Sequence, residues 1–272
     1  MKQSEWQREL RKHAKIYGLF IKNGLIAQLE FRANFVTGIL VECGYLLAKL
    51  LYVLVVYRTG VTINGLKPDS ILMFVGTYTM MTGLFVGLFM TNFMNLSQHV
   101  RTGSLDFLMT KPVSLQFITT LRHVDIGMPL PNLLGGAVMV GIGWHRMGIP
   151  LDIGSLASFA GYIVGAVVLT YSVFLLPELL AFKFVSTRAL TEISHALWDF
   201  NNMPMGIYHT WVRRIGVFVL PIFLITNFSP LFVLGQLSPG YIAWGIAAPI
   251  LFLALNRYLW TRAVKQYASA SS

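Results

Sequence analysis

The stretch FVTGILVECGYLLAKLLYVLVVY, residues 35–57, decides the fold class of this chain. Its only charged residues are Glu42 and Lys49, and most of the others are apolar. About 20 predominantly apolar residues in an α-helix are enough to cross the hydrocarbon core of a bilayer, where a helix satisfies its own backbone hydrogen bonds. Residues 35–57 are therefore predicted to form a membrane-spanning helix.

The rest of the chain repeats this pattern. Of its 272 residues, 55% are hydrophobic and only 12% are charged, and the mean hydropathy is +0.63, which excludes a soluble domain. Further spans are predicted near residues 70–93, 116–147, 156–182, 213–229 and 240–260, which makes an all-α integral membrane protein with six transmembrane helices. The third span is interrupted near its start by Arg122, His123, Asp125, Pro129 and Pro131, so this start is either cytoplasmic or kinked.

The distribution of basic residues predicts the orientation of the spans. The chain has 21 Lys and Arg against 11 Asp and Glu, a net charge of +10. If both termini are cytoplasmic, 17 of these bases lie on the cytoplasmic side, only Arg58, Lys67 and Arg146 lie outside, and Lys49 lies within the first span. The opposite orientation would violate the positive-inside rule. We therefore expect a multi-pass protein of the bacterial cytoplasmic (inner) membrane with both termini in the cytoplasm, and no nucleic-acid partner.

The chain divides into three segments. Residues 1–34 are predicted to form a basic amphipathic helix on the inner leaflet, in contact with membrane lipid, because apolar residues recur at helical spacing and bases occupy the remaining arc. The apolar positions are Trp6, Leu10, Ala14, Tyr17 and Ile21. A soluble basic tail is the alternative. Residues 35–260 form the six-span domain and residues 261–272 a cytoplasmic tail, and no signal peptide is expected.

Motifs that would make the chain an enzyme are missing from the sequence. There is no G-x-x-x-x-G-K-[ST], so the chain has no P-loop for a nucleotide, and ATP-driven work would need another polypeptide. No catalytic spacing such as H-E-x-x-H or G-x-S-x-G occurs, and the six histidines are dispersed. The single cysteine, Cys43, allows neither an intrachain disulfide nor a Cys-based zinc site. We expect no catalytic, cofactor-binding or metal-binding residues.

Four ionisable residues fall within or beside predicted spans, where each is costly in hydrocarbon. Glu42 and Lys49 are two helical turns apart and share a face, which predicts a polar contact with a neighbouring helix or a second subunit; a role in translocation is the alternative. Glu178 follows Pro177 and is expected to reach the cytoplasmic interface by snorkelling. Asp125 is expected to pair with Arg122 or His123.

Two further patterns concern helix packing and bending. The pairs Gly83–Gly87 and Gly161–Gly165 are G-x-x-x-G motifs, which let helix backbones approach closely. The stretch ALWDFNNMPMGIYHTWVRRIGVFVLPIFLITNFSP, residues 196–230, predicts an amphipathic cytoplasmic segment that ends at Arg213-Arg214 and then a fifth span. Pro221 kinks that span and Pro230 marks its outer end. Residues 227–239 are uncharged and too short to cross and return, which predicts a short re-entrant cap on the outer side.

The loop between the second and third spans, RTGSLDFLMTKP (residues 101–112), is amphipathic around a Gly-Ser step. An ordinary loop packing on the membrane would look similar. Together with LEFRANF (29–35) and MPMGIYHTWVRRIGVFVLPIFLITNFSP (203–230), this loop resembles the permeases of ABC-2 type transporters over nearly the whole chain. The residues of the late stretch that carry the resemblance are Pro204, Arg213, Pro221 and Pro230.

The resemblance implies that residues 95–109 form a coupling helix, which docks in a groove of an ATPase subunit. The contact residues would be Val100, Arg101, Gly103, Leu105, Asp106 and Phe107. One departure is that Phe107, Met109 and Thr110 stand where relatives carry a longer aliphatic run. The resemblance also implies a second permease subunit, identical or related, and two copies of the ATPase, which uses ATP and Mg.

The function expected on these grounds is the transmembrane permease subunit of an ATP-driven ABC-2 type exporter. By analogy with the family, the substrate path would lie between two permeases and be lined by spans one, two and five. The alternative is an ion-coupled secondary transporter in which Glu42, Asp125 or Glu178 titrates, although the sequence has no evident inverted repeat. A membrane enzyme is the third possibility and lacks any catalytic constellation.

Overall fold

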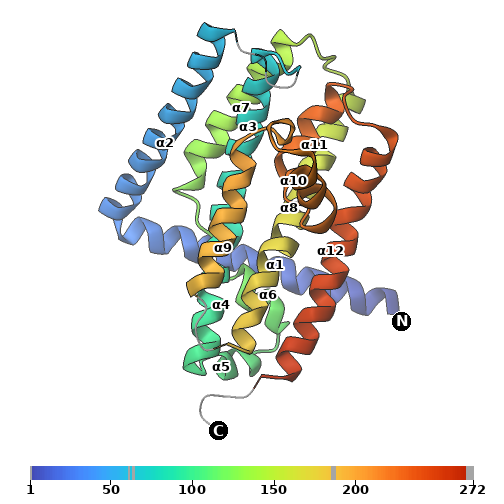
Figure 1. Ribbon diagram of the computed structural model, residues 1–272. Coiled ribbons are helices and arrows are strands. Elements are labelled where there is room, and N and C mark those ends of the chain that lie inside the picture. The colour runs from blue at the N-terminus through green and yellow to red at the C-terminus, as the bar shows by residue number, and fades with distance from the viewer. Residues whose placement is uncertain (1, 61, 63–64, 185–187, 268–272) are drawn as a thin grey trace.

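The computed structural model describes residues 2–60, 62, 65–184 and 188–267, and the regular elements in these ranges are helices (Figure 1). The longer ones are α1 (Lys2–Glu30), α2 (Arg32–Thr59), α3 (Pro68–Phe85), α4 (Thr91–Thr102), α7 (Pro129–Arg146), α8 (Ile153–Glu178), α9 (Arg188–Asp199), α11 (Phe223–Val233) and α12 (Pro239–Lys265). The shorter ones are η1 (Val86–Met90), α5 (Leu105–Met109), α6 (Leu115–Leu121), η2 (Leu179–Phe182), η3 (Phe200–Asn202), η4 (Met205–Ile207), α10 (Thr210–Arg214) and η5 (Ile215–Val219). The predicted all-α fold class is confirmed.

Most long helices run roughly parallel, and α1 lies across them near the level where α2 begins (Figure 1). The short helices α5 and α6 gather at one end, together with the end of α12. We call this the coupling end, and we call the other end, where α2 finishes and α3 starts, the far end. The helix α1 is held by Gly24, which packs against the Val124 carbonyl, and by Phe20, which stacks on Phe117.

Four helices in the described ranges are long and apolar enough to cross a bilayer. They are Arg32–Thr59, Pro68–Thr102, Ile153–Phe182 and Pro239–Lys265. The predicted spans at 35–57, 70–93, 156–182 and 240–260 all fall on these helices. The second of them contains α3, η1 and α4 in a continuous run of 35 residues, longer than the predicted span, and it ends at Gly103. A protein with several membrane-spanning helices is therefore supported, and the other two predicted spans have a different form.

The third predicted span, 116–147, is not one helix. It is divided into α6 and α7 by the non-helical residues 122–128. The side chain of Asn92 holds this break open, because its amide donates to the His123 carbonyl (2.7 Å) and its oxygen accepts from the His123 N–H (2.8 Å). The Asp125 N–H donates to the Gly87 carbonyl (2.9 Å), and α7 then starts at Pro129, where a proline costs no helical hydrogen bond.

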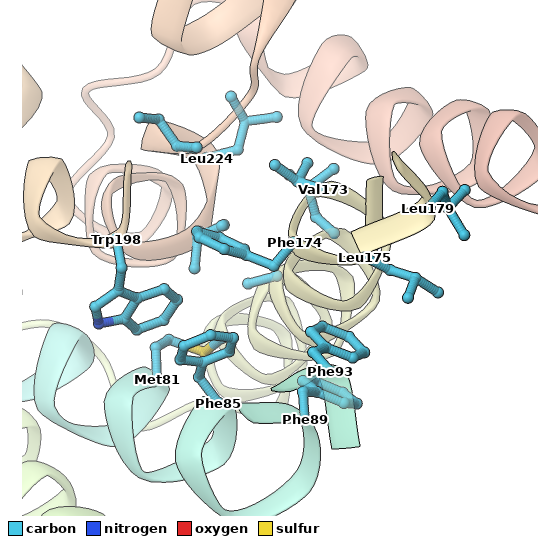
Figure 2. Close-up of a cluster of buried hydrophobic side chains, with 14 of the residues drawn as sticks. Met81, Phe85, Phe89, Phe93, Val173, Phe174, Leu175, Leu179, Trp198 and Leu224 are labelled. Carbon is cyan, nitrogen blue, oxygen red and sulfur yellow. The ribbon is translucent and has the colours of Figure 1, made fainter. Parts of the chain in front are cut away.

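The fifth predicted span, 213–229, is not one straight helix. The segment predicted to be cytoplasmic before it contains α9, which packs between α3 and α8. Trp198 of α9 stacks on Phe85 (4.5 Å between ring centroids) and meets Phe174 edge-on (5.4 Å), as Figure 2 shows. Ser194 lines a small cavity with Met94 at the coupling half of the molecule, whereas Met205 lies beside Leu66 at the far end. Between Ser194 and Met205, the chain therefore passes from the coupling half of the molecule to the far end.

The residues after α9 turn back into the molecule from the far end. Arg213 lines a cavity with Leu66 and Ser70 at the start of α3, and Leu234 lines the same cavity. Between them, Leu220 lines another cavity together with Leu197 of α9. The two helical pieces, Thr210–Val219 and Phe223–Val233, are bent by 99°. Such a bent pair is either a broken span or a re-entrant loop, and its two ends line one cavity at the far end, so we call residues 210–233 the re-entrant loop.

The core joins α3, α4, α8, α9 and α11. Its largest fully buried side chains include Phe223, Phe228 and Phe174, the last of which is labelled in Figure 2. The predicted close approach at Gly83–Gly87 is confirmed, because an added Cβ would lie 3.1 Å from the Pro129 carbonyl oxygen at Gly83 and 2.7 Å from the Pro129 ring at Gly87. Gly161 faces open space, so the second G-x-x-x-G pair does not bring two backbones together.

Two predicted segment boundaries lie close to helix ends. The helix α1 ends at Glu30 and α2 begins at Arg32, near the boundary predicted at residue 34. The predicted C-terminal tail, 261–272, begins as helix, since α12 continues through Lys265, and residues 268–272 lie outside the described ranges.

Candidate functional site

The predicted coupling segment consists of the last turn of α4, a glycine turn and α5, rather than one helix over 95–109. Gly103 has φ +71°, a left-handed conformation that a side chain disfavours, and its N–H bonds to the Val100 carbonyl. The Ser104 hydroxyl bonds His99 Nδ1 (2.8 Å) and the Thr102 hydroxyl (3.0 Å). These bonds fix the turn at the tip of the 35-residue helix Pro68–Thr102.

The predicted contact residues of this segment have different environments. Leu105 is fully buried in the main core, so its expected contact with an ATPase stays a prediction that this burial does not favour. Phe107 is 65% exposed, and the ammonium of Lys111 lies 3.9 Å from its ring centroid. Arg101 is exposed and donates to Gln98 (2.8 Å). Val100, Gly103 and Asp106 are half-buried, and the Asp106 N–H donates to the Gly103 carbonyl.

A groove of about 810 Å³ lies beside this turn. Its walls come from α1, the start of α2, α5 and the break between α6 and α7, and they include Phe20, Phe31, Phe107, Lys111 and Arg122. Burial, then the charges of Arg122 and His99, lower the pKa of His123 in the same wall. The groove therefore offers aromatic surface with basic groups at the coupling end.

Buried polar side chains tie α6 to the long helices: the Thr120 hydroxyl lies 3.1 Å from the Tyr171 hydroxyl of α8, and both α8 and α12 are reached by Gln116. Its amide donates to the Tyr171 hydroxyl of α8 (3.0 Å) and to Asn256 Oδ1 of α12 (3.1 Å), and its oxygen accepts from Arg257 (2.6 Å). Asn256 in turn donates to the Ser172 carbonyl (3.0 Å). The sequence reasoning missed these residues, because no local pattern shows that three distant segments meet.

Glu42 and Lys49 share one face of α2, as their spacing predicted, and both contact Asn132 of α7. The Asn132 amide donates to Glu42 Oε2 (2.6 Å), and Lys49 Nζ donates to Asn132 Oδ1 (3.3 Å). Lys49 also lies 5.1 Å from the ring centroid of Tyr78. The two charges therefore join α2 to α7 within one chain. A single asparagine in the sequence gave no signal of this role.

Glu178 and Asp125 differ from their predicted environments. Glu178 is 2% exposed and accepts from the Ser97 hydroxyl (2.7 Å), so it does not reach the surface by snorkelling. Asp125 makes no ion pair with Arg122 or His123 in the described ranges; its Oδ1 accepts from the Met128 N–H (3.3 Å) before α7 begins. Glu178 therefore joins α8 to α4, and Asp125 accepts a bond at the start of α7.

The two singled-out prolines shape the re-entrant loop. Pro221 lies in the break between η5 and α11, so the predicted kink is a break at which the two helical pieces are bent by 99°. Pro230 is buried inside α11 and does not mark the outer end of a straight span. Within the described ranges, no group of three or more His, Cys, Asp or Glu side chains is placed to hold a metal ion.

The comparison with protein families decides the identity of this architecture. The family described as "ABC-2 family transporter protein" matches residues 43–271. The chain belongs to this family. An ABC-2 family member with several helices able to span a bilayer is a multi-pass membrane component of an ABC transporter. The comparisons with curated proteins and with solved structures found no match.

The matched residues of this ABC-2 family chain include the turn at Gly103, the Gln116 contacts and the whole re-entrant loop. They leave out α1 and the start of α2. The groove at the coupling end thus lies between the family domain and an N-terminal helix that precedes it.

Proposed function

We propose that this chain is the permease subunit of an ATP-driven ABC-2 exporter and that a separate ATPase subunit docks at its coupling end. The observation that carries the proposal is the exposed, rigidly held turn between α4 and α5. Phe107 offers a large apolar surface beside Lys111 and Arg101, and Leu105 anchors the same short helix in the core. A fixed aromatic with basic neighbours is typical of an interface anchor.

The long helix Pro68–Thr102 supports a mechanical role for this turn. It is continuous from the far end to Gly103, so a displacement of α5 acts on the whole length of α3 and α4. Gln116 links α6, the next helix after the turn, to α8 and α12. Movement of a docked ATPase would therefore be passed to three long helices at once.

We infer six crossings made by α2, α3 with α4, α7, α8, α9 with η3, and α12. The re-entrant loop between α9 and α12 does not cross. This arrangement keeps both termini in the cytoplasm. It moves Arg213 and Arg214 to the outer side, but most of the bases stay on the cytoplasmic side, as the positive-inside rule requires.

Two surfaces support pairing with a second permease. Only 11% of the residues in the most apolar stretch of α2 are buried, so much of this helix faces lipid or another subunit. The exposed side of α9 carries Glu192, His195 and Asp199, polar groups that are expensive against lipid. We place the substrate path along this side of α9, between two permeases, with ATP and Mg used only by the ATPase copies.

Ion-coupled secondary transport is the competing function, and Glu178 is the carboxylate that favours it. A proton-coupling carboxylate must alternate between two accessible sides. Glu178 faces a cavity of only about 20 Å³ and already accepts from Ser97. This enclosure favours a structural role for Glu178 and leaves the ATP-driven function better supported.

The test is co-purification of the full chain with its ATPase subunit. Phe107→Ala should weaken association by about tenfold or more, because interface energy concentrates in a few anchors. Leu151→Ala is the matched control, since Leu151 is 77% exposed but lies between α7 and α8 at the far end. Equal association of the wild type and Phe107→Ala would overturn the docking site. ATP hydrolysis by the homogeneous chain alone would overturn the permease function.

A further inference from the structure

The re-entrant loop encloses a cavity of about 280 Å³ at the far end, which we call the far-end cavity. It is lined by Leu66 and Ser70 at the start of α3, by Pro204 and Arg213, and by Pro230 of α11. Three of the four late residues that the sequence singled out, Pro204, Arg213 and Pro230, therefore meet in one place. The transport mechanism described above uses none of them.

Among the described residues that line this cavity, Arg213 is the only charged one. It is half-buried, and its guanidinium makes no ion pair or hydrogen bond with a residue in the described ranges. The two carboxylates at the far end are engaged elsewhere: Asp69 contacts Arg146 and Tyr57, and Asp152 accepts from Ser155. A partly desolvated guanidinium without a counter-ion is costly, so the cavity is suited to an external anion.

The remaining walls define the kind of anion. The side chains of Gln236 and Tyr241 line the cavity and have no hydrogen-bond partner in the described part of the chain, so both can donate to an oxygen. Asn227 is already used, since it accepts from the Met205 N–H (2.8 Å) and donates to Thr226. Leu66, Phe74 and Leu231 make the rest of the wall apolar.

We propose that the far-end cavity binds the phosphate group of an amphiphile, with Arg213 as the ionic partner. An arginine presents a planar fork of donors that matches two phosphate oxygens. The apolar walls fit the glycerol and first carbons of a phospholipid, and the cavity is near the lower size limit of small-molecule sites. The site does not involve the ATPase, so a failure of this proposal would leave the proposed function unaffected, and the reverse also holds.

The experiment measures binding of short-chain phosphatidylglycerol to the purified full chain in detergent, by titration of thermal stability. Wild type should bind saturably. Arg213→Gln should weaken binding by about tenfold or more, because hydrogen bonds to charged groups are the strong ones. Arg213→Lys should fall between them, because a point charge lacks the fork. Arg214→Gln is the matched control, since Arg214 is the exposed neighbour and should leave binding unchanged.

Two ligand controls separate the sources of the phosphate. Dioctanoylglycerol, which lacks the phosphate, should not bind. Inorganic phosphate should bind more weakly than the lipid; equal binding would overturn the amphiphile assignment. Equal lipid binding by wild type and Arg213→Gln, or no saturable binding by wild type, would overturn the site itself.

A second variant covers the case in which Arg213→Gln does not fold. Leu234→Trp keeps the charge but fills part of the cavity, since Leu234 lines it. It should weaken lipid binding while the unliganded protein stays monodisperse. Unchanged lipid binding in this variant would place the lipid elsewhere and overturn the proposal.

Discussion

At the scale of single residues, neighbours in one short helix have opposite roles. Leu105 and Phe107 are both large and apolar, and the sequence offered both as contacts with an ATPase. Leu105 is fully buried among core side chains, whereas Phe107 projects from the molecule beside Lys111. Residues two positions apart in a helix point in different directions, so one of the pair packs in the core and the other is left for a partner.

This difference gives the first prediction. Leu105→Ala should lower the free energy of unfolding by about 2 to 5 kcal/mol, because it leaves a cavity in the core. Phe107→Ala should leave it nearly unchanged, because little of that side chain is buried. Thermal unfolding of the two purified variants checks this, and equal destabilisation would mean that α5 is packed differently.

The second prediction concerns Asn132, which lies between Glu42 and Lys49. Asn132→Leu should destabilise the chain by about 1 to 3 kcal/mol, because two half-buried charges lose their hydrogen-bonding partner. In a chain that already carries Glu42→Gln and Lys49→Met, the same change should cost clearly less. Equal costs in the two backgrounds would show that Asn132 acts through packing alone.

At the scale of elements, hydropathy predicted the long helices and misplaced the short ones. The helices at 35–57, 70–93, 156–182 and 240–260 were predictable because each presents about 20 apolar residues. The helix α9 was not, because it has 12 residues and a polar side, and it is held by Trp198 in an aromatic core that the sequence does not reveal. The re-entrant loop is more apolar than α9, so hydropathy favoured it as the fifth span.

Only part of the candidate site could be predicted from the sequence. The turn at Gly103 was visible as an amphipathic stretch between apolar runs. The contacts of Gln116 and Asn132 were not, because they pair helices far apart in the chain, and a lone amide has no periodic signal. The partners of buried polar side chains depend on which helices pack together, and the local sequence does not show this.

The third prediction is that α6 transmits movement through Gln116. Gln116→Leu should leave the ATPase associated but reduce the stimulation of hydrolysis by substrate, because α6 loses the bonds of Gln116 to α8 and α12 and keeps the bond of Thr120 to Tyr171. Thr119→Val is the matched control: Thr119 is buried in the same helix, but its hydroxyl bonds only carbonyls of α6. Loss of coupling in both variants would point to a general defect of α6 instead.

At the scale of the whole molecule, one question separates the inferred arrangement from six straight spans, namely which side of the membrane holds the re-entrant loop. Arg213 and Leu234 share a cavity with the start of α3, so both ends of the loop lie at the far end. A straight fifth span would instead place the two arginines in the cytoplasm. In the inferred arrangement, the far end faces the outer aqueous phase and the coupling end faces the cytoplasm.

The last prediction tests this directly with single cysteines in a chain that carries Cys43→Ala. In sealed cells, an impermeant thiol reagent should label Arg214→Cys, in the loop, and Lys67→Cys, just before α3, but not Ser104→Cys at the coupling turn. After permeabilisation all three should react, which controls for accessibility. If Arg214→Cys reacted only after permeabilisation while Lys67→Cys reacted before it, the loop would have a cytoplasmic start. The chain from 210 to 233 would then cross the membrane, and α9 would have to be removed from the six crossings.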